Sequence, residues 1–352
     1  LAQGETLVEA LNAVFSGLVR SDLFNRLLLA ASLTWKEVDL IRAYFYFARQ
    51  TGQTFAPEAV QKVLLFHNDF AALLIELFRL RFEPEDSRSA DTRARAWQAK
   101  LADAEQYLNG VKAFDEDRVL RLFLNLIVST LRTNFYVQRS DDQHFISLKF
   151  DCASIKELPN PRPMFEIYVH HAEVEGIHLR GGKVARGGIR WSDRLEDYRT
   201  EVLGLMATQM LKNTVIVPVG AKGGFVIKDP IEEWAEGRAR ADRLYQIFIR
   251  GLLEVTDNIV AGEVKRPDDV LCHDDEDPYL VVAADKGTAH LSDTANQLAS
   301  DAGFWLGDAF ASGGSVGYDH KIKGITAKGA WVCVRHHFRE LGMDPEHDPI
   351  TV

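Results

Sequence analysis

Apolar residues in the first third of the chain recur at intervals of three and four positions, the spacing of an amphipathic helix. The residues with this spacing are Leu7, Leu11, Val14, Phe15, Leu18, Val38, Ile41, Tyr44 and Phe45. Pro57 stands where a first helical turn would begin, and one long helix is predicted from there to about Phe82. Further helices are predicted over 91–109 and 116–132. Residues 1–132 are therefore predicted to form a helical region, whose plainest role is packing or assembly.

The pattern changes near Thr133, where apolar residues begin to alternate as they do in strands. The alternating residues are Phe135, Val137, Phe145, Ser147 and Phe150. Later elements are predicted as strands over 165–169, 215–219 and 280–284, and as helices over 195–212, 231–258, 291–301 and from an N-cap at Thr326 to about Leu341. Strands that alternate with helices indicate an α/β domain, here over 133–349, and 350–352 has the pattern of a further strand's start.

Composition narrows the class of protein. The chain has 352 residues, of which 46% are hydrophobic and 26% charged, as in an ordinary globular protein. Its net charge of -10 argues against general nucleic-acid binding, and no apolar run reaches membrane-spanning length. The three cysteines lie far apart, which favours a cytoplasmic protein without disulfides. Because the first residue is Leu, we expect the chain to be a piece of a longer protein.

The stretch 184–230 concentrates cations in glycine-rich sequence. Arg186 and Arg190 lie in RGGIR, Lys212 ends a predicted helix, and Lys222 lies inside GAKGG. Glycine beside a lysine lets the backbone approach a small ligand closely. Several cations that converge on one place suit a substrate with more than one carboxylate.

Two short predicted strands are each followed by an ionisable residue. The strand over 215–219 leads into Lys222, and the strand over 280–284 leads into Asp285. Ligands of open α/β sheets gather at the carboxyl ends of strands, so we expect Lys222 and Asp285 to face each other at one rim, among other cations. Burial and those cations would have to lower the pKa of Lys222 by roughly 2 units for base chemistry near neutral pH.

Plainer interpretations stay open for these residues. A lysine beside glycine is commonly a solvated loop cation, and an aspartate after a strand commonly caps a helix or forms a turn. GAKGG lacks the spacing and the following Ser or Thr of a phosphate loop, which disfavours nucleotide hydrolysis. The paired histidines at 170–171 and 336–337 would point apart and do not predict a metal site. The acidic run 273–278 is predicted to be an exposed loop.

A longer series of motifs resembles the large bacterial NAD-specific glutamate dehydrogenases. The series runs RGGIRWSDR, QMLKN, VPVGAKGGF, VVAADKGTAHLSDTAN and GYDHKIKGITAKGAW, and it covers about 184–332. The smaller glutamate dehydrogenases have a similar order of KGG(L/I)R, a helix that ends in lysine, GGxKGG, and an aspartate before a glycine. The resemblance implies a helical N-terminal region followed by a mixed-sheet α/β substrate domain of the amino-acid dehydrogenase type.

The resemblance also implies roles for individual residues. Lys222 resembles the catalytic lysine of this family, and Asp285 resembles the catalytic aspartate. Lys212 resembles the lysine that holds the substrate α-carboxylate, and Arg186 stands where the smaller enzymes have a lysine for the side-chain carboxylate. The other implied site residues are Arg190, Gly187 and Gly188 around the substrate and Thr326 near the nicotinamide.

The implied reaction is the NAD-dependent oxidative deamination of L-glutamate to 2-oxoglutarate and ammonia. A hydride would pass from the substrate Cα to NAD, Lys222 would activate the water that attacks the iminium, and Asp285 would shuttle protons. The family also implies a homo-oligomer and a dinucleotide-binding domain that begins at 350–352. We therefore expect the chain alone to bind substrate weakly and to show no turnover.

Two alternatives remain. A dehydrogenase for a branched or aromatic amino acid would share the two-lysine pattern, but it would need no cation such as Arg186 at the side-chain end of its substrate. A non-catalytic regulatory or assembly module could keep the same fold, although the presence of Lys222 and Asp285 counts against it.

Overall fold

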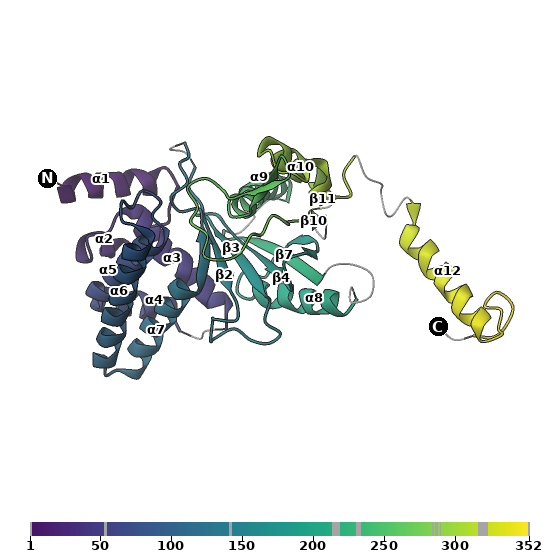
Figure 1. The fold of residues 1–352 in the computed structure, drawn as a ribbon, viewed down its shortest axis with the longest axis horizontal. Coiled ribbons are helices and arrows are strands. Elements are labelled where there is room, and N and C mark those ends of the chain that lie inside the picture. The colour runs from purple at the N-terminus through teal and green to yellow at the C-terminus, as the bar shows by residue number, and fades with distance from the viewer. Residues whose placement is uncertain are drawn as a thin grey trace.

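The computed structural model describes residues 2–52, 55–140, 143–212, 219–229, 234–283, 285, 288, 290–315 and 323–350. In Figure 1 the N-terminal helices lie on one side of a central sheet. Further helices lie across its other face, and the last helix lies apart from the rest. A mixed sheet covered by helices confirms the α/β class predicted from the sequence. Among the described helices, none combines the length and apolar content that crossing a membrane requires.

The N-terminal helices follow the predicted apolar spacing. They are α1 (Ala2–Phe15), α2 (Leu27–Ala30), α3 (Trp35–Gln50), α4 (Pro57–Phe66), α5 (Asn68–Phe82), α6 (Ala90–Gly110) and α7 (Phe114–Ser129). Thr34 and Glu37 form a capping box at the start of α3. Pro57 begins α4 as predicted, but the single helix predicted to Phe82 is wrong, because His67 adopts a non-helical backbone conformation that separates α4 from α5.

The remaining elements form and cover the sheet. The strands are β1 (Thr130–Thr133), β2 (Ile146–Asp151), β3 (Phe165–His170), β4 (Val174–Arg180), β5 (Ala185–Arg186), β6 (Ile189–Trp191), β7 (Val219–Ile227), β8 (Asn258–Val260), β9 (Glu263–Lys265), β10 (Val282–Ala283) and β11 (Ala311–Ser312). The helices are α8 (Tyr198–Lys212), α9 (Trp234–Leu253), α10 (Ser292–Asp301) and α12 (Ile325–Glu340).

The main sheet is mixed. Its strands run in the order β1-β2-β3-β4-β7, each antiparallel to the next, and β5 and β6 then pair in parallel with successive parts of the far edge of β7. The neighbouring strand β10 meets this edge through a parallel bridge between Arg186 and Val281, and it pairs with β11. The chain segment that carries Arg186 therefore lies between β7 and the strand that leads to Asp285.

Two hydrophobic cores cover the two faces of the sheet. One core joins the N-terminal helices and α8 to side chains such as Phe150, Ile177 and Val226. The other joins α9 and α10 to the opposite face through residues such as Val169 and Phe225. Since successive strand residues face opposite sides, the central strands β3, β4 and β7 contribute to both cores and are buried on both faces.

Several element predictions are wrong at their ends. Residues 135–137 are not a strand, since β1 ends at Thr133 and β2 starts at Ile146. Helix α12 begins after Gly324, whose left-handed φ of 59° suits glycine, so Thr326 lies inside the first turn and is not the N-cap. Part of the predicted strand over 215–219 lies outside the described residues, as do residues 231–233 of the predicted helix over 231–258, and positions 351 and 352.

A buried polar cluster joins the helical region to the sheet. Asp39 on α3 accepts from Arg42 at 2.6 Å, contacts His144 at 2.8 Å, and lies 3.4 Å from His170 on β3. All four side chains are almost fully buried. Burial and the nearby ammonium of Lys228 lower the pKa of His170 to about 3, so this histidine is neutral at ordinary pH. The histidine pair at 170–171 thus contributes a structural contact.

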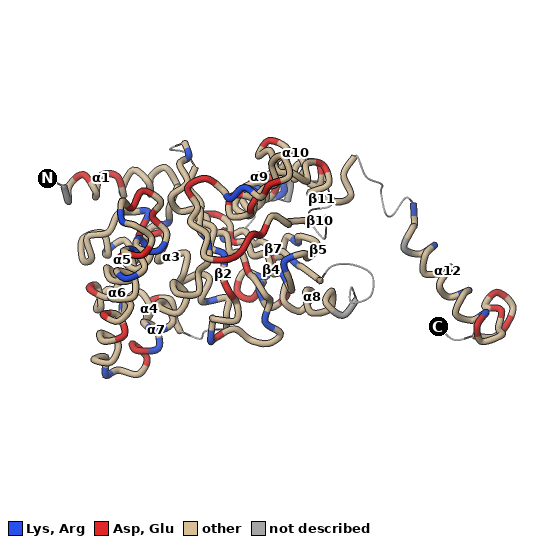
Figure 2. The backbone as a smooth tube through the Cα atoms, viewed as in Figure 1, with Lys and Arg blue, Asp and Glu red and all other residues tan. Residues whose placement is uncertain are grey.

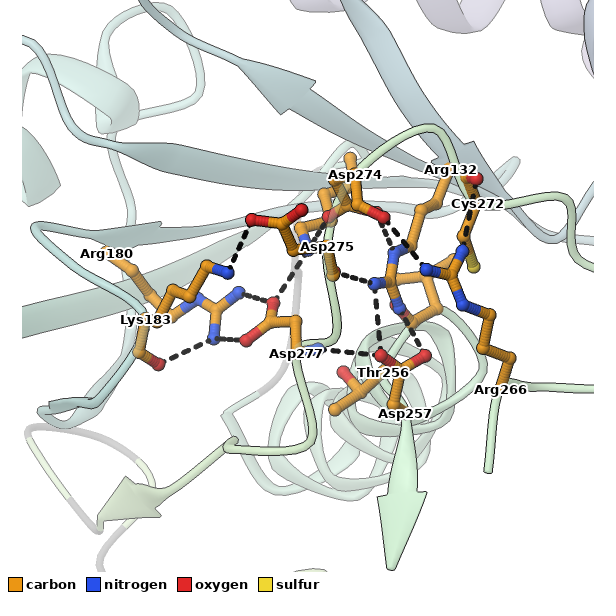
Figure 3. Close-up of polar contacts among 12 residues, drawn as sticks. Arg132, Arg180, Lys183, Thr256, Asp257, Arg266, Cys272, Asp274, Asp275 and Asp277 are labelled. Carbon is orange, nitrogen blue, oxygen red and sulfur yellow. Dashed lines mark hydrogen bonds and ion pairs between the residues drawn. The ribbon is translucent and has the colours of Figure 1, made fainter. Parts of the chain in front are cut away.

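A second buried cluster lies on the opposite face of the sheet (Figure 3). Arg132 on β1 binds Asp257 at 2.6 Å and Asp274 at 2.6 Å, and Lys149 on β2 binds Asp277 at 2.7 Å. The predicted exposure of the acidic run 273–278 is therefore wrong in part: the side chains of Asp274 and Asp277 are only 8% and 2% exposed. Buried cations of the sheet draw this loop inward, because an unpaired buried charge is very costly.

Candidate active site

The site is built on the paired strands β5, β6 and β7. Arg186 lies opposite Gly220 and Arg190 lies opposite Gly224 in one continuous parallel register. That register sets Gly188 opposite Lys222, and the Gly223 N–H donates to the Gly188 carbonyl at 2.9 Å. Because side chains alternate along strands, Arg186, Arg190 and Lys222 project from the same face of the sheet.

Lys222 lies inside strand β7 and not in a loop after a strand, which corrects the sequence prediction. The glycine-rich segments are extended, and their glycines allow neighbouring segments to come close. A side chain at Gly187 would overlap the backbone oxygen of Ala221. A Cβ at Gly188 would lie 3.1 Å from the Asp285 Cβ and 3.4 Å from the Lys222 Nζ. Gly187 thus lets its segment approach β7 closely, and Gly188 leaves the space in which lysine and aspartate meet.

Lys222 and Asp285 form an ion pair, as the sequence predicted when it placed them at one rim. The Lys222 side chain is only 6% exposed, while that of Asp285 is 27% exposed and so remains open to solvent. Burial, and then the Arg190 guanidinium, lower the pKa of Lys222 to about 8, against an opposing effect of Glu201. An amine with this pKa exchanges its proton near neutral pH, as a general base requires.

Arg190 is held in place by Glu201, a residue that the sequence prediction missed. It donates to the Glu201 carboxylate at 2.7 Å, and the second oxygen of Glu201 accepts from the Ser192 hydroxyl at 2.7 Å. Glu201 lies in the first turn of α8, which covers this face of β7. No spacing rule links Glu201 to Arg190, because they lie on different elements and meet only when α8 packs on the sheet.

Arg186 differs from Arg190 in being exposed. Within the described part of the chain its side chain makes no ion pair or hydrogen bond, so its guanidinium is available to an anionic ligand. The end of α8 packs close to the same part of β7, since a Cβ at Gly220 would lie 2.8 Å from the Met210 nitrogen. Lys212 is the last residue of α8, but the side chains of Lys212 and Thr326 lie outside the described residues.

The buried cluster of Figure 3 supports the strand that leads to Asp285. Arg180, at the end of β4, binds the Asp277 carboxylate and donates to the Tyr279 carbonyl at 2.8 Å. The same guanidinium lies 3.4 Å from the Lys183 carbonyl, just before β5. One buried arginine therefore connects the segments that lead to Arg186 and to Asp285. The sequence prediction missed this connection because these residues are far apart along the chain.

Basic and acidic positions are interspersed along the backbone. In Figure 2 positions with Lys and Arg alternate with positions of Asp and Glu over most of the chain, and several basic positions lie beside β4 and β5. The described residues contain no group of three or more His, Cys, Asp or Glu side chains placed to hold a metal ion.

The fold is that of an α/β domain of the dehydrogenase type. Residues 103–352 match the family model for the catalytic domain of bacterial NAD-glutamate dehydrogenase, and residues 19–84 match the model for helical motif 3 of glutamate dehydrogenase. The chain belongs to the bacterial NAD-glutamate dehydrogenase family.

Curated relatives agree with this family. The chain is 52% identical over 99% of its length to an NAD-specific glutamate dehydrogenase of Pseudomonas aeruginosa, and 48% identical over its whole length to that of Mycobacterium tuberculosis. A relative of the same name from Neurospora crassa is 26% identical over 84% of the chain. The chain spans only 22% of the length of the two bacterial relatives and 29% of the fungal one.

Proposed function

We propose that the protein to which this chain belongs catalyses the NAD-dependent oxidative deamination of L-glutamate to 2-oxoglutarate and ammonia, and that this chain supplies the substrate-binding and catalytic residues. The observation that carries the proposal is the contact of a mostly buried lysine of lowered pKa, Lys222, with the partly exposed carboxylate of Asp285. The three relatives described above are all NAD-specific glutamate dehydrogenases, which supports the same reaction.

Lys222 and Asp285 have complementary roles in this proposal. Lys222 in its neutral form accepts a proton from the water that attacks the substrate iminium carbon. Asp285, which is open to solvent, carries protons to and from the substrate nitrogen. The ion pair favours the charged amine, so a substrate nitrogen that engages Asp285 would also free Lys222 to act as a base.

The cations around this pair select a substrate with two carboxylates. We assign Arg186 to the side-chain carboxylate because its exposed guanidinium has no partner in the described part of the chain. Lys212 is assigned to the α-carboxylate, and Arg190 adds positive charge beside Lys222. We assign Gly188 to substrate binding because a Cβ there would crowd Asp285 and Lys222, and Gly187 because a side chain there would collide with the Ala221 backbone and move this strand. An apolar amino acid has no side-chain carboxylate for Arg186 to bind, which favours glutamate as the substrate.

The described residues account for less of cofactor binding than of substrate binding. NAD, when bound, accepts the hydride from the substrate Cα. A strand followed by a glycine-rich turn that opens a helix is the arrangement that binds a dinucleotide. Strand β11 is followed by Gly313 and Gly314, but residues 316–322, between them and α12, lie outside the described residues. We therefore assign this chain to the substrate side of the reaction. Thr326 remains our proposed contact to the nicotinamide.

The setting of the reaction is also proposed. We assign the helical region, residues 1–132, to packing or assembly, and residues 133–349 to catalysis. The free state of the three cysteines supports a cytoplasmic location, and the homo-oligomer is proposed from membership of the family.

Replacing the lysine tests the proposal directly. In the full-length protein that carries these residues, Lys222→Met should reduce glutamate-dependent NAD reduction by at least about a thousandfold, because the general base is lost. Lys265→Met is the matched control, since Lys265 is an exposed residue of β9 and should leave the rate unchanged. Full activity of the Lys222→Met protein would contradict the proposal.

A further inference from the structure

The carboxylate of Asp285 belongs to a turn that a single threonine closes. The Thr288 N–H donates to the Asp285 carbonyl at 3.1 Å, and the Asp285 N–H donates to the Thr288 hydroxyl at 3.1 Å. Thr288 is only 1% exposed. The backbone of the aspartate is therefore fixed on both sides by the same residue.

The same hydroxyl also forms a hydrogen bond with strand β6. It donates its proton to the Ile189 carbonyl at 2.8 Å, a better acceptor than the Asp285 carbonyl at 3.4 Å. Ile189 is the first residue of β6, directly after Gly188. A hydroxyl has one proton and two lone pairs, so the Thr288 side chain can accept from the Asp285 N–H and donate to the Ile189 carbonyl at the same time.

We propose that Thr288 is a positioning residue for the reaction: its hydroxyl joins the turn that carries Asp285 to the strand that carries Gly188 and Arg190. This inference rests on the proposed function of the site. Neither residue 285 nor the beginning of β6 can shift without breaking a buried hydrogen bond, which leaves a buried polar group unpaired. A misplacement of the carboxylate by about 1 Å would cost a large factor in rate.

Two replacements separate the hydroxyl from the rest of the side chain. Thr288→Val keeps the shape and removes both hydrogen bonds, whereas Thr288→Ser keeps the hydroxyl and loses a methyl group. In the full-length protein we expect Thr288→Val to lower kcat for glutamate oxidation by roughly tenfold or more, with KM for glutamate changed less than about twofold, because Asp285 handles protons and not carboxylates. Thr288→Ser should recover most of kcat.

The matched control is Thr256→Val. Thr256 is also buried, and its hydroxyl donates to the Leu252 carbonyl at the same distance of 2.8 Å, but at the end of α9 and away from the pocket. It should leave kcat unchanged. A Thr288→Val protein with wild-type kcat overturns the proposal, and so does a Thr288→Ser protein as slow as Thr288→Val, since packing would then decide the rate.

A second measurement keeps this inference separate from the proposed function. Among the described residues, the charged side chains of Arg190, Glu201 and Asp285 face Lys222. If Thr288 positions Asp285, Thr288→Val should shift the titration of the Lys222 amine to lower pH as the carboxylate moves away, and Thr288→Ser should restore it. An NMR titration of the chain reports this shift whether or not glutamate is the substrate. An unchanged titration in Thr288→Val contradicts the positioning role alone.

Discussion

At the scale of single residues, Gly188 decides whether the lysine and the aspartate can meet. It lies opposite Lys222 in the register of β6 and β7, and a Cβ there would lie 3.1 Å from the Asp285 Cβ. This separation is tighter than ordinary van der Waals contact and would push the two functional groups apart. The glycine is therefore needed for space and not for an unusual backbone conformation.

Gly188→Ala should reduce activity more than stability. We expect kcat to fall roughly tenfold because the carboxylate is displaced, while the free energy of unfolding changes by about 1 kcal/mol or less. Gly187→Ala should be worse, because its Cβ would overlap the backbone of Ala221. Gly204→Ala on α8 has open space and should be neutral or slightly stabilising. Steady-state kinetics and urea unfolding of the three variants check this order.

Residue types predicted part of this site. Cations among glycines, and an aspartate after a short apolar run, identified Lys222 and Asp285 before any coordinates. The same reasoning could not find Glu201 or Thr288, because their partners lie on other elements and ordinary polar residues carry no signal of their own. Residues in an unusual local sequence can be recognised from a single chain. The residues that orient them can be recognised only from the three-dimensional structure.

At the scale of elements, strand prediction succeeded where the pattern was apolar. Strand β3 was predicted almost to its ends because Phe165, Ile167 and Val169 alternate with other residues. Strand β4 was missed although it is buried throughout. Its sequence contains Glu175 and Arg180, whose burial depends on partners from distant segments. A buried strand that carries charges does not have the pattern expected of one.

Asp277 should be the most important residue of the cluster in Figure 3. Asp277→Asn should destabilise the chain by about 3 to 5 kcal/mol, because Lys149 and Arg180 would lose their buried counter-charge. Asp275→Asn, two positions away, should cost little, since the Asp275 side chain is 87% exposed. Urea unfolding of both variants at pH 7 checks the difference, and equal stabilities would contradict it.

The pH dependence of this effect has a definite sign. Although burial opposes ionisation, Arg180 and then Lys149 lower the pKa of Asp277 to about 2. A carboxyl with a depressed pKa stabilises the fold above its unfolded value of about 3.9, and the contribution is lost as the pH falls toward 2. The stability difference between the wild-type chain and Asp277→Asn should therefore be full above about pH 4 and shrink below it.

At the scale of the whole molecule, the sheet and the last helix differ in how they are held. Strand β3 is buried on both faces, with Tyr168 and Val169 fully covered, whereas α12 lies apart from the other elements in Figure 1 and exposes Trp331 and Val332. Helices owe most of their stability to packing of an apolar face and not to intrinsic propensity. The stability of α12 within this chain should therefore be local and low.

Hydrogen exchange of the 352-residue chain should show this difference. Amides of α12 should exchange well before those of β3, and before those of α10, a helix that packs on the sheet and serves as the internal control. Mass spectrometry of peptides from the three segments measures the order. Protection of α12 equal to that of α10 would contradict this prediction, because α12 would then need stabilising contacts beyond those described here.

The central claim is that β6, β7 and the segment after β10 together hold Lys222 as an amine able to lose its proton near neutral pH. The most direct measurement is the titration of the Lys222 amine by NMR after isotopic labelling of lysines, with Lys222→Met to assign the signal. The structure predicts a pKa of about 8, moved lower in Glu201→Gln, because that glutamate favours the charged form. A value near the ordinary lysine pKa of about 10.4, unchanged in Glu201→Gln, would contradict the claim.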